Sequence, residues 1–166
     1  MNMPARCGAL TNDVIPNWDL APPELTWKER VAYLTVQFLK LPQIECPVEH
    51  GFPKGWYTRT MFIPADTLFL GRSHIKGHKC VLERGEVIHL AEGLPNTQVK
   101  APFQMVTWPG YQMVFYTITD CIGVTWHHNT ENSRDIEKLE AAAFEPVQNL
   151  IDLGTAVESR MLTWQA

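Results

Sequence analysis

The 166-residue sequence predicts a mainly β protein: an antiparallel β-barrel of the jelly-roll type, preceded by an amphipathic helix and followed by C-terminal helices. Two observations carry this prediction. Between residues 57 and 126, short runs rich in Val, Ile, Phe, Tyr and Thr alternate with turn residues at close intervals. On both sides of this region the hydrophobic spacing changes to the three-and-four pattern of helices.

An N-terminal arm and one helix precede the predicted barrel. Residues 1–23 are rich in Pro and Asn without sustained periodicity, which predicts an extended arm. A helix is expected within residues 24–42, because Thr26 and Glu29 form a capping box and Pro42 cannot continue a helix. Its apolar stripe can cover the end of the barrel or dock on a neighbouring subunit, and we favour the first. The stripe consists of Trp27, Val31, Leu34, Phe38 and Leu41.

The predicted barrel spans residues 50–128, with Gly or Pro at nearly every junction between its runs. The clearest strand-length runs are 57–63, 87–90 and 114–119. A C-terminal helical segment is expected over residues 132–166. There Pro146 would end one helix and open a second, and Gly154 would follow the end of the second.

Composition and charge narrow the class of protein. Hydrophobic residues make up 45% and charged residues 19% of the chain, which is enough to fill a core and too little charge for a disordered tail. The formal net charge of −4 argues against nucleic acid as a partner. No apolar run reaches the roughly 18 to 20 residues that cross a bilayer, and no signal-peptide pattern is present. We therefore expect a cytoplasmic protein without membrane contacts.

The four cysteines are far apart and form no C-x-x-C pair, which disfavours a zinc or thioredoxin-like site. Two disulfides are the alternative, but nothing indicates export and a chain of this length does not need them. We expect reduced, mostly buried thiols.

One stretch resembles a known family. The segment from Gly71 to Glu86, followed by Trp108-Pro109-Gly110, is similar to the two motif stretches of the cupin superfamily. In that family the first stretch supplies two histidines and a carboxylate, and the second supplies a histidine after a Pro-Gly turn. From about Trp27 to Glu140 the chain is also similar to short single-domain cupin-like proteins of phages and prophages. The resemblance implies a cupin-like barrel but no particular activity, because this barrel hosts many functions.

The metal-binding pattern that this resemblance implies is incomplete. His74 falls on the second histidine position and His78 on the carboxylate position, whereas Arg72 and Met113 stand where the other two histidines belong. A later histidine is present at His127. Together His74, His78 and His127 can supply three imidazoles to a divalent transition metal such as Zn, Fe, Mn or Ni.

These histidines also have a simpler interpretation. In a straight strand residues four apart are separated by roughly 13 Å, so His74 and His78 meet only if the chain bends near Gly77. Without that bend they are solvent-facing turn residues. In an alternating strand either His127 or His128 faces the interior, and the sequence does not say which.

Five further residues are candidates for ligand or subunit contacts. Arg72, like Arg59, lies on or beside a barrel strand and can meet an anionic ligand, although a strand-edge charge is the commoner role. Trp108 and Tyr111 bracket the Pro-Gly turn at the expected barrel mouth, outside the aromatic core. Trp18 in the arm and Trp164 near the C-terminus supply apolar anchors.

Two functions remain open. The first is a non-catalytic scaffold or interaction module of phage or prophage type, which acts in a homo-oligomer or with other virion proteins through its terminal extensions. The depleted ligand set favours it, and it needs no cofactor. The second is a metal-dependent cupin enzyme of oxygenase or isomerase type, with a histidine site at the barrel mouth. The surviving pair His74 and His78 favours it, and we rank it second.

Overall fold

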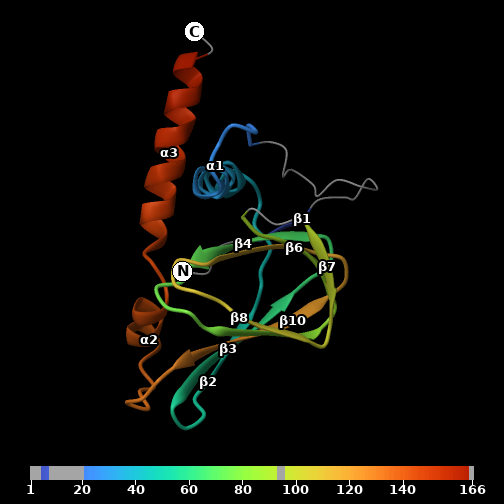
Figure 1. The fold of residues 1–166 in the computed structure, drawn as a ribbon, viewed down its shortest axis with the longest axis vertical. Helices are drawn as coiled ribbons and strands as arrows, with labels where there is room; N and C mark the ends of the chain where they lie inside the picture. Colours follow the sequence, from blue (N-terminus) through green and yellow to red (C-terminus); the bar gives the residue numbers. More distant parts are fainter. Residues whose placement is uncertain (1–4, 8–20, 93–95, 165–166) are drawn as a thin grey trace.

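The structure, a computed structural model, describes residues 5–7, 21–92 and 96–164. In these ranges ten strands form two five-stranded antiparallel sheets that face each other, with three helices outside them (Figure 1). The strands are β1 (Ala5–Cys7), β2 (Val48–Gly51), β3 (Trp56–Ile63), β4 (Thr67–Ser73), β5 (Lys79–Arg84), β6 (Glu86–Leu90), β7 (Thr97–Lys100), β8 (Phe103–Val106), β9 (Gln112–Thr117) and β10 (Cys121–His128). The helices are α1 (Trp27–Leu39), α2 (Ile136–Ala143) and α3 (Val147–Trp164).

The strand order is that of a jelly roll. One sheet has the order β1-β4-β9-β6-β7 and the other β2-β3-β10-β5-β8. The eight strands from β3 to β10 thus form two facing four-stranded sets, as in eight-stranded jelly rolls. This confirms the predicted mainly β fold with a preceding helix and C-terminal helices. The strands begin slightly earlier than predicted, because β2 starts at Val48 and pairs with β3.

Helix α1 covers the outer face of the sheet that contains β4. The predicted capping box is present: the Glu29 amide donates to Thr26 Oγ1 at 3.3 Å, and the Thr26 amide donates to Glu29 Oε2 at 3.1 Å. The buried face of the helix packs against residues of β4, β6 and β9. This cluster contains Val31, Leu34, Phe38, Leu68, Leu70, Leu90, Val114 and Tyr116. The helix therefore packs on its own domain, as expected, but it covers the outer face of a sheet and not the end of the barrel.

The C-terminal segment differs from the prediction at Gly154. Helix α3 runs through Gly154 to Trp164 instead of ending near it, and rises beside α1 away from the barrel (Figure 1). A Cβ atom at Gly154 would lie 2.2 Å from the Ala32 carbonyl oxygen and 2.7 Å from Val36 Cγ2. The glycine therefore permits the close crossing of α1 and α3 and does not cap a helix.

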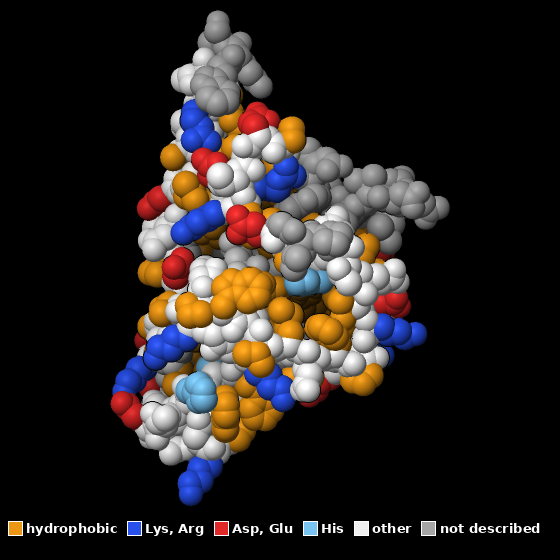
Figure 2. Space-filling view, in the orientation of Figure 1, with side chains coloured by type: hydrophobic (Ala, Val, Ile, Leu, Met, Phe, Trp, Pro, Cys, Tyr) orange, Lys and Arg blue, Asp and Glu red, His pale blue; other side chains and the backbone are white. Residues whose placement is uncertain are grey.

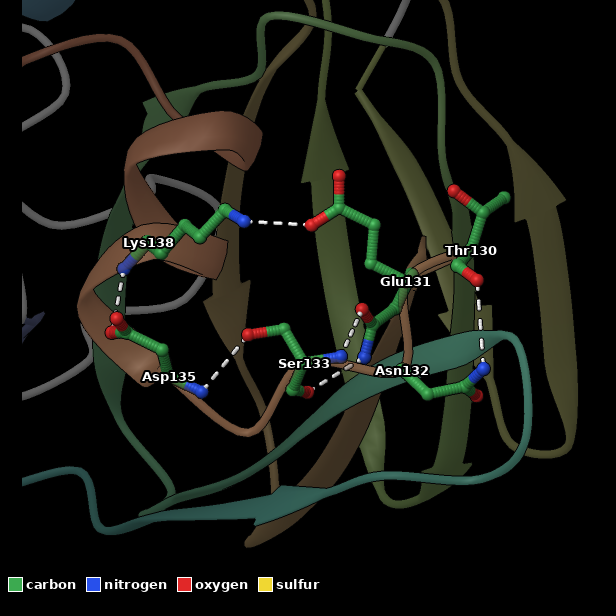
Figure 3. A network of polar contacts seen from close by, with 7 residues as sticks. Thr130, Glu131, Asn132, Ser133, Asp135 and Lys138 are labelled. Carbon is green, nitrogen blue, oxygen red and sulfur yellow. Dashed lines mark hydrogen bonds and ion pairs between the residues drawn. The ribbon is translucent and has the colours of Figure 1, made fainter.

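A hydrogen-bonded loop after β10 fixes the start of α2 (Figure 3). Asn129 bonds to the backbone of Ser133 twice, at 2.9 Å each. Asp135 caps α2 by accepting from the Lys138 amide at 3.0 Å, and Lys138 pairs with Glu131 at 2.6 Å. This loop turns the chain from the sheet into a helix that runs along the barrel end.

The end of α2 is tied to the end of β4 by backbone hydrogen bonds. The Ile75 amide donates to the Ala143 carbonyl at 2.9 Å, and the Glu145 amide donates to the Ser73 carbonyl at 3.0 Å. His74 also forms a β-bridge with Phe144. These contacts bring residues 140–144 to the end of the barrel where β4 finishes.

The terminal extensions are described only in part. Ala5–Cys7 of the predicted arm pairs as β1 with β4 of the same chain, so this part of the arm contacts its own barrel. Trp18 and the side chain of Trp164 lie outside the described residues. Cys46, Cys80 and Cys121 are free and buried, as predicted for thiols in the described part of the chain. None of the described helices is long and apolar enough to span a membrane.

Candidate functional site

The two sheets enclose a cavity of about 130 Å³. Most of its lining is apolar and comes from both sheets, and Figure 2 shows a hollow framed mainly by hydrophobic side chains on one face of the molecule. The apolar lining includes Met61, Ile63, Phe69, Val87, Val99, Met105, Met113 and Phe115. Among the described residues that line the cavity, none is Asp or Glu.

The polarity of the cavity changes from one end to the other. Because side chains alternate along a strand, every second residue of β3 and β10 points into the barrel. At one end Ile63 lies opposite Cys121, and further along Arg59 lies opposite Thr125. Gly123 stands between them on β10 and adds no side chain to the lining. The cavity is thus apolar at the Ile63 end and polar at the Arg59 end.

Three histidines meet beside the polar end. His74 and His78 are each only 4% exposed, and their rings stack with centroids 3.5 Å apart and planes 20° apart. The ring of His127 lies 5.4 Å from His74 and 5.1 Å from His78. The chain therefore bends between His74 and His78, and the solvent-facing interpretation of these two residues is wrong. His127, not His128, is the buried member of its pair.

Close packing holds the bend. A Cβ atom at Gly77 would lie 2.6 Å from the Thr107 carbonyl oxygen, so only glycine permits this approach. The His78 amide donates to Thr107 Oγ1 at 3.1 Å, and the Thr107 amide donates to the His78 carbonyl at 2.8 Å. Thr107 comes from the segment after β8, which therefore fixes the position of His78.

Both ring nitrogens of His78 are in hydrogen bonds. Nδ1 lies 2.8 Å from Thr107 Oγ1, and Nε2 lies 3.0 Å from Cys80 Sγ. Burial raises the pKa of Cys80 to about 12, so its thiol is protonated at neutral pH and can donate to Nε2. Burial lowers the pKa of His78 to about 4, which keeps the ring neutral.

The ring nitrogens of His74 differ from those of His78 in their hydrogen bonding. Neither ring nitrogen of His74 has a hydrogen-bond partner among the described residues, although both are buried. Burial, and then the nearby His78 and His127, lowers the pKa of His74 to about 2. Burial likewise lowers the pKa of His127 to about 3, and its Nε2 lies 3.2 Å from Thr125 Oγ1. All three imidazoles are therefore neutral at pH 7.

The three histidines do not fit a bound metal in this arrangement. An imidazole binds a metal in its ring plane, and the stacked rings of His74 and His78 direct their nitrogens side by side instead of toward one point. The nitrogens of His78 are also engaged elsewhere. Across residues 5–7, 21–92 and 96–164, no group of three or more His, Cys, Asp or Glu side chains is placed to hold a metal ion. Metal binding by these residues stays a prediction.

Arg59 and Arg72 both face one carboxylate at the polar end. Arg59 Nε lies 3.2 Å from Glu140 Oε1, and Arg72 Nη1 lies 3.6 Å from Glu140 Oε2. The Phe144 ring lies against both, with its centroid 4.8 Å from the Arg59 guanidinium carbon and 4.6 Å from that of Arg72. Arg59 is buried and Arg72 nearly so, so neither is a solvent-facing charge at a strand edge.

The two aromatic candidates near the Pro-Gly turn differ in their exposure to solvent. Trp108 is 56% exposed, as predicted, whereas Tyr111 is only 4% exposed. The placement of Tyr111 outside the core is therefore wrong, because its hydroxyl bonds to His89 and its ring packs against Trp108. Met113 and Arg72, which stand where the resemblance to cupins would place histidines, both line the cavity.

The sequence alone does not indicate that several residues belong to this site. Glu140 and Phe144 are about 70 residues from His74 in the chain and lie on a helix and its end, where a carboxylate and an aromatic ring are ordinary. Cys80 lies within the stretch from Gly71 to Glu86 and Thr107 directly precedes Trp108-Pro109-Gly110, but the ligand pattern of these stretches gives neither residue a role. Only the alternation of apolar residues on the strands indicates that Met61 and Met113 face the interior.

No protein-family model matches the chain, and no curated protein is significantly similar to it. An acetylacetone dioxygenase from Acinetobacter johnsonii is 15% identical over 50% of this chain and 58% of its own, with a TM-score of 0.40. An RmlC-like cupin family protein from Methanocaldococcus jannaschii is 11% identical over 58% of this chain and 86% of its own, with a TM-score of 0.44. An uncharacterized conserved protein with a double-stranded β-helix domain from Klebsiella pneumoniae is 14% identical over 59% of this chain and 90% of its own, with a TM-score of 0.45.

Cupins are thus among the solved structures that resemble the chain. The match spans less than two thirds of the dioxygenase. Identities and TM-scores of this size carry no argument about what the chain binds or does, and the jelly-roll topology stands on the observed strand order. The phage-type resemblance stays a prediction.

Proposed function

We propose that this chain is a binding protein for a small, mainly apolar molecule, which occupies the cavity inside the barrel. The observation that carries the proposal is the cavity of about 130 Å³, whose lining is mostly apolar and includes Arg59, Arg72 and His74 at one end. Apolar cavities of roughly 150 Å³ in proteins bind benzene. Burial of an apolar ligand supplies the affinity, and a few polar groups fix its orientation.

The lining supports binding of a ligand that varies somewhat in shape. Met61, Met105 and Met113 come from three different strands and all border the cavity. Methionine side chains are unbranched and polarizable, and they adapt to irregular partners. The cavity can therefore close around a benzene-sized molecule without movement of the strands.

The histidines favour binding over acid–base catalysis. A general base works best when its pKa lies near the operating pH. The pKa of His74 is about 2, that of His127 about 3 and that of His78 about 4, so each is a weak base at neutral pH. The metal-dependent enzyme stays the alternative, and it requires the imidazoles to leave their stacked arrangement.

Methyl NMR of the methionines tests the proposal. In protein labelled with ¹³C at the methionine methyl groups, benzyl alcohol should shift the signals of Met61, Met105 and Met113. The signal of Met161, on α3, is the internal control and should stay in place. Absence of saturable shifts in the three cavity methyls would contradict the proposal.

Two substitutions at Gly123, one large and one small, test whether the ligand binds inside the cavity. A Cβ atom there would meet only the Val81 carbonyl oxygen, at 3.9 Å, so alanine is accommodated. Gly123→Leu should fill part of the cavity and abolish the benzyl alcohol shifts, whereas Gly123→Ala should keep them. Thermal unfolding of both variants is the control, and both should show a cooperative transition. Equal binding by Gly123→Leu would place the ligand outside the barrel.

The predicted assembly role has support from a separate surface. Strand β8 forms the edge of its sheet and pairs only with β5 among the described strands. On it and just after it, Val106 is 75% exposed and Trp108 is 56% exposed. An exposed apolar edge strand can pair with another chain, and two copies of β8 pairing antiparallel would form a closed dimer. We propose such a homodimer as the second function, and virion partners stay a prediction.

Light scattering distinguishes a dimer from a monomer by mass. The unmodified chain should have the mass of a dimer, and Val106→Lys should have the mass of a monomer. Gln148→Lys, which adds the same charge on the exposed side of α3, should remain dimeric. A monomeric unmodified chain would contradict this second proposal and leave the cavity proposal untouched.

A further inference from the structure

We propose that the ligand of the barrel cavity is a small apolar carboxylic acid, bound as its carboxylate at the end formed by Arg72 and His74. This inference rests on the proposed function and names the chemical class of the ligand. The apolar part of such a molecule would lie among the methionines, and its carboxylate would lie at the polar end. Three observations support it.

The first observation is the charge at the polar end. Arg59 and Arg72 are permanently charged at neutral pH, and Glu140 is the carboxylate that both of them face. The three histidines are neutral at pH 7. The described part of the cavity lining contains no Asp or Glu, so the two arginines carry two positive charges against the one negative charge of Glu140. The polar end therefore carries an excess positive charge, and an anionic ligand would neutralise it.

The second observation is a set of buried nitrogens without hydrogen-bond partners. Arg72 Nε and both ring nitrogens of His74 are buried and have no partner among the described residues. Buried polar groups in folded proteins are almost always hydrogen-bonded, so such groups need an explanation. A neutral imidazole has one N–H donor, and the guanidinium Nε–H is a second. A carboxylate accepts from both, whereas an apolar ligand satisfies neither.

The third observation is that these donors share one neighbour. The centroid of the Phe144 ring lies 4.6 Å from the His74 ring centroid and 4.6 Å from the Arg72 guanidinium carbon. The two donor groups therefore both lie against the same side chain, and both border the cavity. Glu140 already shows that a carboxylate is held here, at 3.2 Å from Arg59 and at the longer distance of 3.6 Å from Arg72.

A pair of matched probes tests the inference. Benzoate and benzyl alcohol share an aromatic ring and differ in the carboxylate, and their affinities can be measured by methionine-methyl NMR at pH 7. Benzoate should bind at least about tenfold more tightly, because it gains charge-assisted hydrogen bonds. If neither probe binds, the proposed function fails. If benzyl alcohol binds as tightly as benzoate or more so, the cavity stands and the carboxylate inference is overturned.

Two substitutions locate the carboxylate. Arg72→Gln should reduce benzoate affinity by about tenfold and leave benzyl alcohol affinity unchanged. Arg84→Gln, at an exposed position on β5, should change neither. Glu140→Gln removes the competing negative charge and should raise benzoate affinity, which keeps the test decisive if Arg72→Gln does not fold. Unchanged or lower benzoate affinity in Glu140→Gln would overturn the inference.

Discussion

The imidazole rings of His74 and His78 stack in parallel with their centroids 3.5 Å apart, although four positions separate them in the sequence. The chain reverses between them, and Thr107 holds the second histidine from a neighbouring segment. The stacking has two consequences. It turns the ring nitrogens away from a common point, and it leaves His74 with unused nitrogens beside the cavity.

Thr107→Val should destabilise the protein. The valine keeps the shape of the side chain but removes the hydroxyl that accepts from the His78 amide and contacts its Nδ1. A buried donor left without a partner costs about 1 to 3 kcal/mol, so the free energy of unfolding in urea should fall by that amount. Thr107→Ser keeps the hydroxyl and should lose clearly less. Equal losses in both variants would show that packing of the methyl group, and not the hydrogen bonds, matters here.

Stability should fall as the pH is lowered below 6.5. The pKa values of His74, His127 and His78 in the folded protein are about 2, 3 and 4, well below the ordinary value of 6.5. Between pH 6.5 and the folded pKa values, the unfolded chain binds protons that the folded chain does not, so acidification favours unfolding. Each histidine should contribute up to about 2 kcal/mol of loss between pH 6.5 and 5.

Urea unfolding at pH 7 and pH 5 measures this loss of stability. A histidine variant then shows whether His127 contributes to it. Burial is the largest cause of the lowered pKa of His74 and of His127, and the positive charge on Arg59 adds to it. His127→Gln should therefore show a smaller difference in stability between the two pH values than the unmodified chain. His128→Gln, at the exposed neighbouring position, should keep the full difference. A pH-independent stability would mean that the three histidines are not buried.

Local patterns predict the helices better than the site. The capping box of Thr26 and Glu29 and the apolar stripe after it depend on neighbours within one turn, and α1 forms where they indicate. Alternation on β10 predicts that only one of His127 and His128 faces the interior, but the structure is needed to show that it is His127. The prediction of a helix cap at Gly154 is wrong, because a glycine near the end of a helical pattern is typical of a cap whereas this one lies where α3 crosses α1.

The site depends on contacts between distant segments. Thr107 holds His78 from the segment after β8, Phe144 lies against His74, and the arginines acquire their partner from Glu140 on a helix that comes after the barrel. No spacing within the sequence encodes these pairs. The histidines could therefore be predicted as candidates, but their stacked arrangement and the cavity beside them could not.

Gly154→Ala should destabilise the protein even though alanine favours helices. In an exposed helix this change stabilises by about 1 kcal/mol. At Gly154 the added Cβ would lie 2.2 Å from the Ala32 carbonyl oxygen, so α1 and α3 must move apart. Overpacking of this kind costs about 1 to 3 kcal/mol. Thermal unfolding should show a lower midpoint for Gly154→Ala, while Thr155→Ala, on the exposed side of α3, should not lower it. A raised midpoint for Gly154→Ala would contradict the close crossing.

The proposed function requires an apolar cavity inside the barrel that admits a small ligand. A crystal structure under xenon pressure tests it most directly, because xenon binds in apolar cavities and scatters strongly. We predict anomalous density inside the barrel, bordered by Met61, Met113 and Phe115. Crystals of Gly123→Leu should show weaker density or none at that place. Absence of xenon from the barrel of the unmodified protein, with side chains filling the space between the sheets, would contradict the account.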